Sequence, residues 1–301
     1  MTAVDVRIYE VGPRDGLQAE GTVVATEDKL RFVQLLAAAG LREIEATSFV
    51  SAKAIPQLAD ADELMAGLER RPGVRYPVLV PNQRGLDRAI AAEVDAICLF
   101  TAATESYVRS NIGMSIQESL AAFEPIATEA RRRGWWLRAY VSTAFGCPYE
   151  GQVDAAAVVR VAERLLAMGV DELSISDTVG VAAPADVDRV LGALAAAGIG
   201  TEVLALHLHD TRGTALANVM AAMERGITAF DASTGGTGGS PFAPGAAGNL
   251  ATEDLVYLLD RQGLRHGVDL DAVLEAGRFI GQALGRPDAV SKVGRAGGWP
   301  R

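Results

Sequence analysis

The strongest constraint on the fold is a regular alternation of short β-branched runs with longer segments of helical period. Eight runs have the composition and length of strands: residues 5–11, 42–47, 76–80, 95–100, 137–143, 172–176, 203–208 and 229–233. Seven segments carry apolar residues every three or four positions: residues 27–39, 57–69, 115–133, 154–168, 184–197, 214–225 and 251–262. Eight β-α units of about 30 residues each are typical of a (β/α)8 TIM barrel, so we predict this α/β fold.

The whole chain is expected to form one catalytic domain, although its length by itself also permits two. Residues 1–301 would be a single TIM-barrel domain, in which 264–301 form a C-terminal helical extension and a loose tail. The structural alternative is a doubly wound open sheet, which would place a glycine fingerprint after the first strand. That strand is followed instead by GPRDGLQ at 12–18, which lacks the GxGxxG spacing.

Charge and cysteine content exclude several classes of function. The chain has 28 Lys and Arg against 38 Asp and Glu, a formal net charge of −10, which disfavours a nucleic acid as partner. Two cysteines, Cys98 and Cys147, cannot form a disulfide framework and indicate a reducing compartment. The N-terminal residues lack the pattern of a signal peptide, and no stretch has the roughly 18 apolar residues of a membrane helix. We therefore expect a cytoplasmic protein without a membrane partner.

Polar residues gather where the predicted strands end, which is where the catalytic groups of TIM barrels lie. His207 and His209 stand out because the chain has only three histidines and these two are one residue apart. Side chains two apart on a strand point to the same face, so both imidazoles should face one cavity. Two histidines that only make hydrogen bonds at the rim are the alternative. We favour a divalent-metal site, with Asp210 either orienting an imidazole or capping the next helix.

The first strand is followed by Arg14 and Asp15 in a Gly-Pro-Arg-Asp-Gly segment. This segment is either an ordinary turn or a site in which Asp15 binds metal and Arg14 stabilises oxyanion charge. Glu45 lies in the second strand and needs a partner if buried, so an ion pair with Arg14 is a structural alternative for it. Asn249 either caps the helix predicted at 251–262 or turns its amide oxygen to the metal.

The segment 235–249, GGTGGSPFAPGAAGN, is too rich in glycine for a packed element. It lacks the Gly-Lys-Ser/Thr of a phosphate-binding P-loop. The remaining interpretations are a simple connection and a lid that closes over a substrate and excludes water.

Six blocks in chain order closely resemble the 3-hydroxy-3-methylglutaryl-CoA (HMG-CoA) lyase family. They are GPRDGLQ (12–18), EATSFVS (45–51), GCPYEG (146–151), SDTVG (176–180), HLHDTRGTALAN (207–218) and GNLATEDLVYLL (248–259). Taken singly, the GPRDG and HxHD patterns are shared with a superfamily that includes condensing enzymes and aldolases. Together the blocks span nearly the whole chain.

The resemblance implies an enzyme that uses Mg²⁺ or Mn²⁺ to cleave a branched 3-hydroxyacyl-CoA into acetyl-CoA and a keto acid, acetoacetate for the family's substrate. It assigns the roles as follows: metal ligands Asp15, His207, His209 and Asn249; catalytic residues Arg14, Glu45, Asp177, His207 and Ser240; substrate-binding residues Gln18, Ser48, Arg138 and Thr178. The partner implied is an acyl-CoA substrate, and the sequence leaves open whether the chain forms a homo-oligomer.

One position departs from the family pattern. The family has a cysteine, implicated in protonating the enolate, where this chain has Ser240 in Gly-Gly-Ser-Pro. A hydroxyl is a much weaker acid than a thiol with a pKa of about 8.5. Three explanations compete. Another group or a water protonates the enolate, the substrate is a different 3-hydroxyacyl-CoA, or the protein is a slow or degenerate lyase. Cys147 matches a further family cysteine, to which we assign a structural role.

Two alternatives to the lyase follow from these observations. One is an aldolase or condensing enzyme of the same superfamily that acts on a 2-oxo acid. The other is a non-catalytic protein that binds acyl-CoA or metal and has lost the loop cysteine at Ser240.

Overall fold

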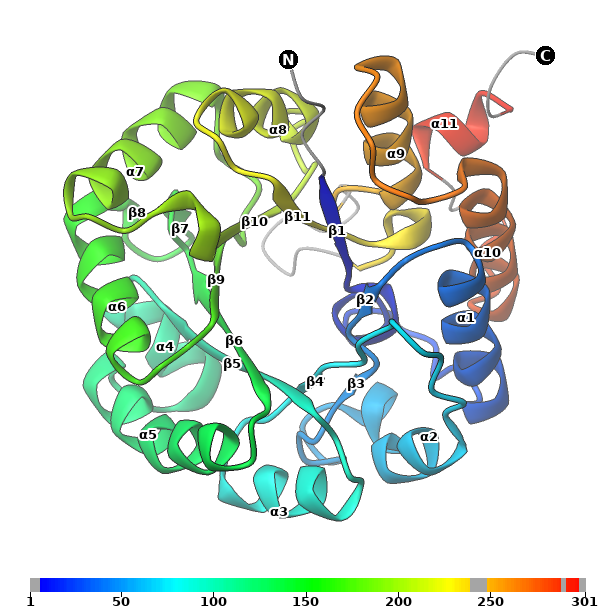
Figure 1. Cartoon of the computed structure of the whole chain (residues 1–301), viewed down its shortest axis with the longest axis horizontal. Helices are drawn as coiled ribbons and strands as arrows, with labels where there is room; N and C mark the ends of the chain where they lie inside the picture. The colour runs from blue at the N-terminus through cyan, green and yellow to red at the C-terminus, as the bar shows by residue number, and fades with distance from the viewer. Residues whose placement is uncertain (1–5, 239–247, 288–290, 298–301) are drawn as a thin grey trace.

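A closed ring of parallel strands surrounded by helices makes up the molecule (Figure 1). The computed structural model describes residues 6–238, 248–287 and 291–297. Its main sheet has the strand order β2-β1-β11-β10-β9-β6-β5-β4-β3. The bounds are β1 (Arg7–Glu10), β2 (Glu43–Ile44), β3 (Thr47–Ser48), β4 (Val78–Leu79), β5 (Ala96–Ala102), β6 (Trp136–Ser142), β9 (Glu172–Asp177), β10 (Leu204–Leu208) and β11 (Ala229–Ala232).

The sheet closes because β2 and β3 are two halves of one interrupted strand. Only Glu45 and Ala46 separate them, and β2 pairs with β1 while β3 pairs with β4. The backbone N–H of Glu45 donates to the carbonyl of Glu10 and that of Ala46 to Pro77, both at 2.9 Å. With β2 and β3 counted together, the eight predicted strands are confirmed and form the predicted barrel.

Helices cover the outside of the barrel and are named in chain order. Their bounds are α1 (Thr26–Ala38), α2 (Ala61–Gly67), α3 (Gln83–Ala91), α4 (Glu105–Ile112), α5 (Ile116–Arg132), α6 (Ala155–Ala167), α7 (Pro184–Ala196), α8 (Ala215–Glu224), α9 (Thr252–Arg261), α10 (Leu270–Ala283) and α11 (Lys292–Arg295). All seven predicted helices are present. The sequence pattern missed α3 and α4, of which α4 buries only Val108 completely. No helix in the described ranges is long and apolar enough to cross a bilayer.

The C-terminal extension contains α10 and α11, which pack outside the barrel. Helix α10 lies against α1, and α11 contacts α9 (Figure 1). The loose tail was predicted at 294–301, but α11 extends to Arg295, and residues 298–301 lie outside the described part of the chain. The assignment of 1–301 to a single domain stays a prediction.

The interior of the barrel holds buried charged groups beside a small apolar cluster, whereas the main hydrophobic core lies between strands and helices. Inward-facing positions of TIM barrels are mostly filled by bulky branched side chains. Here Arg138 is completely buried and donates to both Glu172 and Asp231, and Glu172 also binds Arg7. Charged groups therefore form a chain of ion pairs inside the barrel. This chain of ion pairs leads to the carboxyl ends of the strands, where polar side chains were expected.

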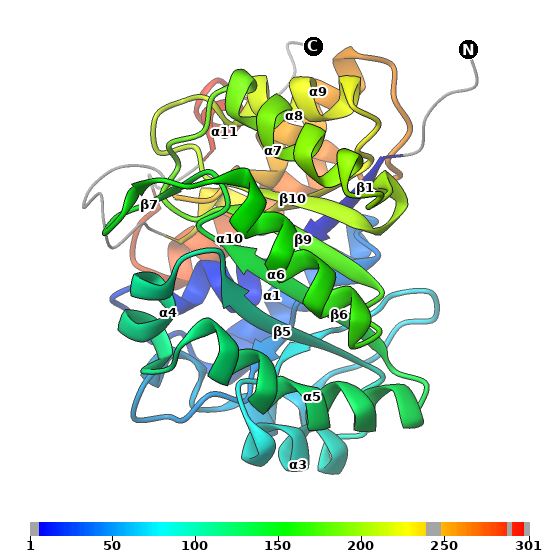
Figure 2. The ribbon, with the colours of Figure 1, turned by 90° about the vertical axis from the view of Figure 1, so that its left-hand side faces the viewer.

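Short elements at the carboxyl ends of the strands complete this end of the barrel. A single wide helical turn, η1 (Gly12–Gly16), follows β1, and a 3-10 turn, η4 (Thr234–Gly236), follows β11. After β6 comes an antiparallel hairpin of β7 (Gly146–Cys147) and β8 (Gly151–Gln152). Figure 2 shows β7 at the end toward which β5 and β6 point.

Candidate metal and catalytic site

Three predicted ligands meet at the carboxyl ends of the strands. Asp15 lies in η1, His207 in β10 and His209 directly beyond β10, and their ligand atoms all lie within 4.8 Å of one another. The two histidine Nε2 atoms are 3.2 Å apart. This arrangement follows from the strand geometry, because residues two apart in β10 project to the same side.

Asn249 joins this cluster through its side chain. Its Nδ2 donates to Asp15 Oδ2 at 2.9 Å and to the carbonyl of Thr237 at 3.2 Å. Its Oδ1 is buried and has no hydrogen-bond partner among the described residues. The alternative role as a helix cap is wrong, since the residue at the cap position of α9 is Ala251. The amide oxygen is therefore available as a ligand.

The donor set fits a divalent metal ion. Two imidazole nitrogens, a carboxylate oxygen and an amide oxygen provide a mixed N,O environment. An oxygen such as Asn249 Oδ1, buried without a hydrogen bond, is costly unless something else satisfies it. The residues present are those that would hold the ion.

Electrostatics keep Asp15 and His209 in the forms that bind metal. Burial would raise the pKa of Asp15, but the positive charge of Arg14, with His207 and the Asn249 hydrogen bond, lowers that pKa to about 2. Burial and the neighbouring His207 lower the pKa of His209 to about 3. Near neutral pH, Asp15 is therefore a carboxylate and His209 a neutral imidazole, as metal ligands must be.

Arg14 connects Asp15 to Glu45. Its Nη1 donates to Asp15 Oδ1 at 2.7 Å and its Nη2 to Glu45 Oε2 at 2.9 Å, so the ion pair considered for Glu45 exists. Gly16 permits this turn, because a Cβ there would lie 2.4 Å from Thr237 Oγ1. The turn thus places Arg14 and Asp15 together at the rim.

Tyr140 belongs to the site and was not predicted from the sequence. Its hydroxyl donates to Glu45 Oε2 at 2.6 Å, and its ring packs edge-on against His207 at 6.0 Å. Arg14 lies over the same ring at 5.2 Å. A signal was present, since Tyr140 is two residues from Arg138 on a strand and shares its face. Glu45 Oε1 has no hydrogen-bond partner among the described residues, so no contact there gives this oxygen a structural role.

Two residues assigned to the site from β9 bind protein groups instead. Asp177 Oδ1 and Oδ2 accept from the backbone N–H groups of Val181 and Ala182, each at 3.0 Å. Burial nevertheless raises the pKa of Asp177. The Thr178 hydroxyl accepts from the backbone N–H of Thr143 at 2.9 Å. Both therefore shape the loops at the rim, and contact with substrate stays a prediction.

The other predicted substrate-binding residues differ in position. Ser48 is completely buried and its hydroxyl donates to the Leu79 carbonyl at 3.3 Å, whereas Gln18 is half-buried just beyond η1. The position of Arg138 does not agree with its predicted contact with substrate. It is sealed inside the barrel, with its three guanidinium nitrogens bound to Glu172 and Asp231. Ser240 lies outside the described residues.

Asp210 and Cys147 have structural contacts. Asp210 Oδ1 accepts from the backbone N–H of Ala215 at the start of α8, and its Oδ2 pairs with Lys292 of α11. It therefore caps the helix and does not orient an imidazole. The Cys147 thiol is buried and accepts from the Thr104 hydroxyl at 3.2 Å.

Two buried carboxylates support η4, which overlaps the start of the glycine-rich segment. Glu10 accepts from the N–H groups of Gly12 and Thr234 at 2.8 and 2.9 Å. Glu253 accepts from the N–H of Gly235 at 2.9 Å. Burial, reinforced by the negative charge of Glu10, raises the pKa of Glu253 to about 8. Neither residue was predicted from the sequence to belong to the site.

The raised pKa of Glu253 predicts a pH-dependent stability. The folded chain holds a proton that the unfolded chain releases above its ordinary pKa of 4.5, so stability falls as pH rises from about 5 to about 8. Glu253→Gln should remove about 4 kcal/mol of this fall, since each of the three pH units from about 5 to about 8 corresponds to about 1.4 kcal/mol. Urea unfolding at about pH 5 and about pH 9 measures the difference. The exposed Glu163→Gln is the matched control, and equal pH dependence in both variants would refute the assignment.

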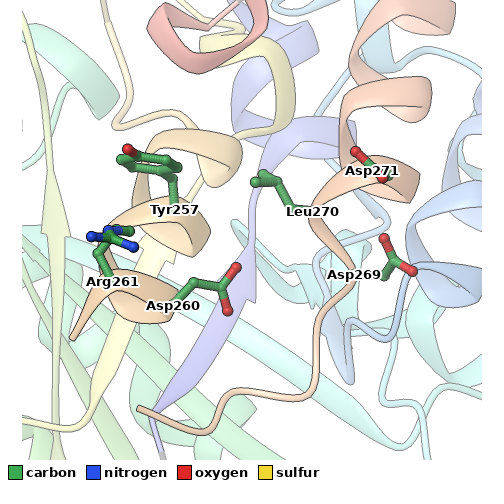
Figure 3. A pocket seen from close by; sticks show the side chains of 6 residues that line it. All are labelled: Tyr257, Asp260, Arg261, Asp269, Leu270 and Asp271. Carbon is green, nitrogen blue, oxygen red and sulfur yellow. The ribbon is translucent and has the colours of Figure 1, made fainter. Parts of the chain in front are cut away.

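A separate pocket lies between the end of α9 and the start of α10 (Figure 3). Its volume is about 350 Å³, and its lining residues are Tyr257, Asp260, Arg261, Asp269, Leu270 and Asp271. The chain just beyond α9 binds Val6, which precedes β1, so this pocket lies toward the amino ends of the strands. It contains none of the predicted site residues and is distinct from the metal cluster.

Comparisons with known proteins agree with the geometry. A hydroxymethylglutaryl-CoA lyase of Bacillus subtilis is 48% identical over 282 residues, which cover 94% of each chain. The structure of a B. subtilis HMG-CoA lyase matches with a TM-score of 0.95 and 46% identity over 98% of this chain and 99% of that one. An HMG-CoA lyase from Acinetobacter baumannii, solved with coenzyme A and 3-methylmalate, has a TM-score of 0.92 and 39% identity over 99% and 97%. These similarities confirm the resemblance found in the sequence blocks. Since the model of the HMGL-like family also matches residues 5–280, the chain belongs to the HMGL-like family.

Proposed function

We propose that this protein is a metal-dependent carbon–carbon lyase that cleaves HMG-CoA, or a close 3-hydroxyacyl-CoA analogue, to acetyl-CoA and a keto acid such as acetoacetate. The observation that carries this proposal is the meeting of Asp15, His207 and His209 beside Arg14 in a chain with near-full-length HMG-CoA lyase relatives. A relative with bound coenzyme A and 3-methylmalate supports an acyl-CoA as substrate. No comparable observation favours an aldolase that acts on a 2-oxo acid.

The reaction breaks the bond between C2 and C3 of the acyl group. The C3 hydroxyl loses its proton and becomes the ketone, the bonding electrons form the enolate of acetyl-CoA, and a proton then adds to C2. A bound Mg²⁺ or Mn²⁺, held by Asp15, His207, His209 and Asn249, would supply Lewis-acid polarisation of substrate oxygens. The remaining tasks are proton removal, charge stabilisation and reprotonation.

Glu45 is the carboxylate best placed to accept the hydroxyl proton. Its Oε2 is held by Arg14 and Tyr140, while its Oε1 has no partner among the described residues. Asp177 is less suitable, because backbone N–H groups occupy both its oxygens. Arg14 adds fixed positive charge beside the site, which stabilises the oxyanion that forms as the bond breaks.

Reprotonation at C2 is the step in which Ser240 matters. We expect Ser240→Cys to raise kcat on HMG-CoA by about tenfold or more, because a thiol is a far better acid than a hydroxyl. Ser240→Ala is the control, since it removes the hydroxyl without adding an acid. Initial rates of acetyl-CoA release measure both. If the cysteine variant is no faster than the unchanged chain, residue 240 does not limit proton transfer.

The function itself is tested with metal-free protein, HMG-CoA and added Mg²⁺ or Mn²⁺, by following acetyl-CoA and acetoacetate. Stoichiometric release that depends on the ion supports the lyase. Binding of HMG-CoA without turnover would overturn the proposal in favour of the non-catalytic alternative.

A further inference from the structure

One buried carboxylate outside the predicted ligand set contacts a candidate metal ligand directly. Asp231 lies on β11, in register with His207 on the neighbouring strand β10. Asp231 Oδ2 is 3.1 Å from His207 Nδ1, and only 1% of Asp231 is exposed. The contact is on the side of the imidazole opposite Nε2, which faces His209. Asp231 can therefore act on the metal site only through His207.

Asp231 is itself held rigidly by side chains on other strands. Arg138 Nη1 donates to its Oδ2 at 3.0 Å, and Nη2 donates to its Oδ1. The Ser174 hydroxyl donates to Oδ2 at 3.1 Å. Arg138 is fixed in turn, because its Nε donates to Glu172 at 2.8 Å and its guanidinium lies 3.9 Å from the ring centre of Tyr9. A bidentate guanidinium–carboxylate contact fixes both the position and the orientation of the carboxylate.

We propose that Asp231 is a positioning residue, which holds a proton on Nδ1 of His207 and so directs the Nε2 lone pair into the metal site, with Arg138 fixing the carboxylate. A carboxylate accepts hydrogen bonds and cannot donate them when ionised, so the nitrogen that faces it must carry the proton. Metal-bound histidines commonly use their second nitrogen in this way. The inference rests on the proposed metal site and adds to it the residue that sets the imidazole.

His209 has no such carboxylate partner among the described residues. His209 Nδ1 is buried and has no hydrogen-bond partner among the described residues. The neighbouring Asp210, which the sequence suggested for this task, binds α8 and Lys292 instead. Among the described residues, a carboxylate therefore sets the tautomer of His207, and none sets the tautomer of His209.

The direct test is the tautomer of His207 in metal-free protein, read from nitrogen-15 NMR of labelled histidine. The chain has only three histidines, and His209→Gln and His266→Gln leave the His207 signals identifiable. We expect a proton on Nδ1 in the unchanged chain. A proton on Nε2 would overturn the proposal, and this measurement requires no change at Asp231.

Asp231→Asn tests the consequence for metal binding. The amide can turn its NH2 group toward Nδ1 and so favour the wrong tautomer. We expect the Mn²⁺ dissociation constant, from electron paramagnetic resonance of free Mn²⁺, to rise by about tenfold or more. Ser174→Ala is the matched control, because it removes a neutral hydrogen bond to the same carboxylate, and it should change that constant by no more than about twofold.

The outcomes separate this inference from the proposed function. A purely structural role would reduce the folded fraction of Asp231→Asn but leave the tautomer and the Mn²⁺ affinity of the folded molecules unchanged, which would refute the inference. Failure of the unchanged chain to cleave HMG-CoA, with Mn²⁺ binding and the Nδ1 proton as expected, would refute the function and leave the positioning role of Asp231 intact.

Discussion

Replacing Asp15 by alanine should lower kcat on HMG-CoA by about a thousandfold or more and weaken Mn²⁺ binding in parallel. The change removes a carboxylate ligand and also leaves Arg14 without one of its two partners. His207→Ala should have an effect of similar size, since it deletes the nitrogen 3.2 Å from His209 Nε2. Steady-state rates at saturating metal, together with direct Mn²⁺ titration, separate lost binding from lost turnover.

Asp62→Ala is the control for general effects of removing an aspartate. Asp62 is exposed on α2. Among the described residues it pairs only with Arg88, and this contact involves no candidate ligand. It should leave kcat and Mn²⁺ affinity unchanged. Near-normal activity in both Asp15→Ala and His207→Ala would refute the metal assignment.

Arg14→Lys should lower kcat by about a hundredfold or more while changing KM much less. The guanidinium uses separate nitrogens to bind Asp15 and Glu45, at 2.7 and 2.9 Å, and lies over Tyr140. A lysine keeps the charge but has one nitrogen and no planar fork, so it cannot hold both carboxylates in place. The loss is expected in kcat because stabilisation of developing charge acts in the transition state.

Initial rates over a range of HMG-CoA concentrations measure the Arg14→Lys effect. Arg132→Lys is the matched control, because Arg132 is exposed on α5 and pairs with Glu129. A kcat within about threefold of the unchanged chain in Arg14→Lys would show that one positive charge suffices and that the forked contact is dispensable.

The sequence predicted those parts of the site that depend on local geometry. His207 and His209 project to one side because of strand alternation, and this holds wherever β10 lies in the barrel. Asp15 and Arg14 follow the first strand, and the carboxyl ends of all barrel strands meet at one rim. Helices α3 and α4 were not predicted from the sequence, and α4 has only one completely buried residue, Val108, to carry a pattern.

Long-range pairing decided the roles that the sequence left open or misassigned. Arg138 and Asp231 are 93 residues apart, and only closure of the barrel shows that they bind each other in the interior. The same closure places Tyr140 on Glu45, 95 residues away. Asn249 becomes available to the metal because α9 starts after Ala251, a detail that the capping preference of asparagine did not reveal.

The sequence by itself determined the eight strands, seven of the helices, the family and the candidate metal ligands, because periodicity and short motifs are local properties of the chain. Only the tertiary structure decided which buried charges neutralise each other. A charged side chain inside a barrel is stable only when opposite charges from distant strands surround it. Those distant partners make Arg138 an interior support and hold Asp231 beside His207, while Glu45 Oε1 has no hydrogen-bond partner among the described residues.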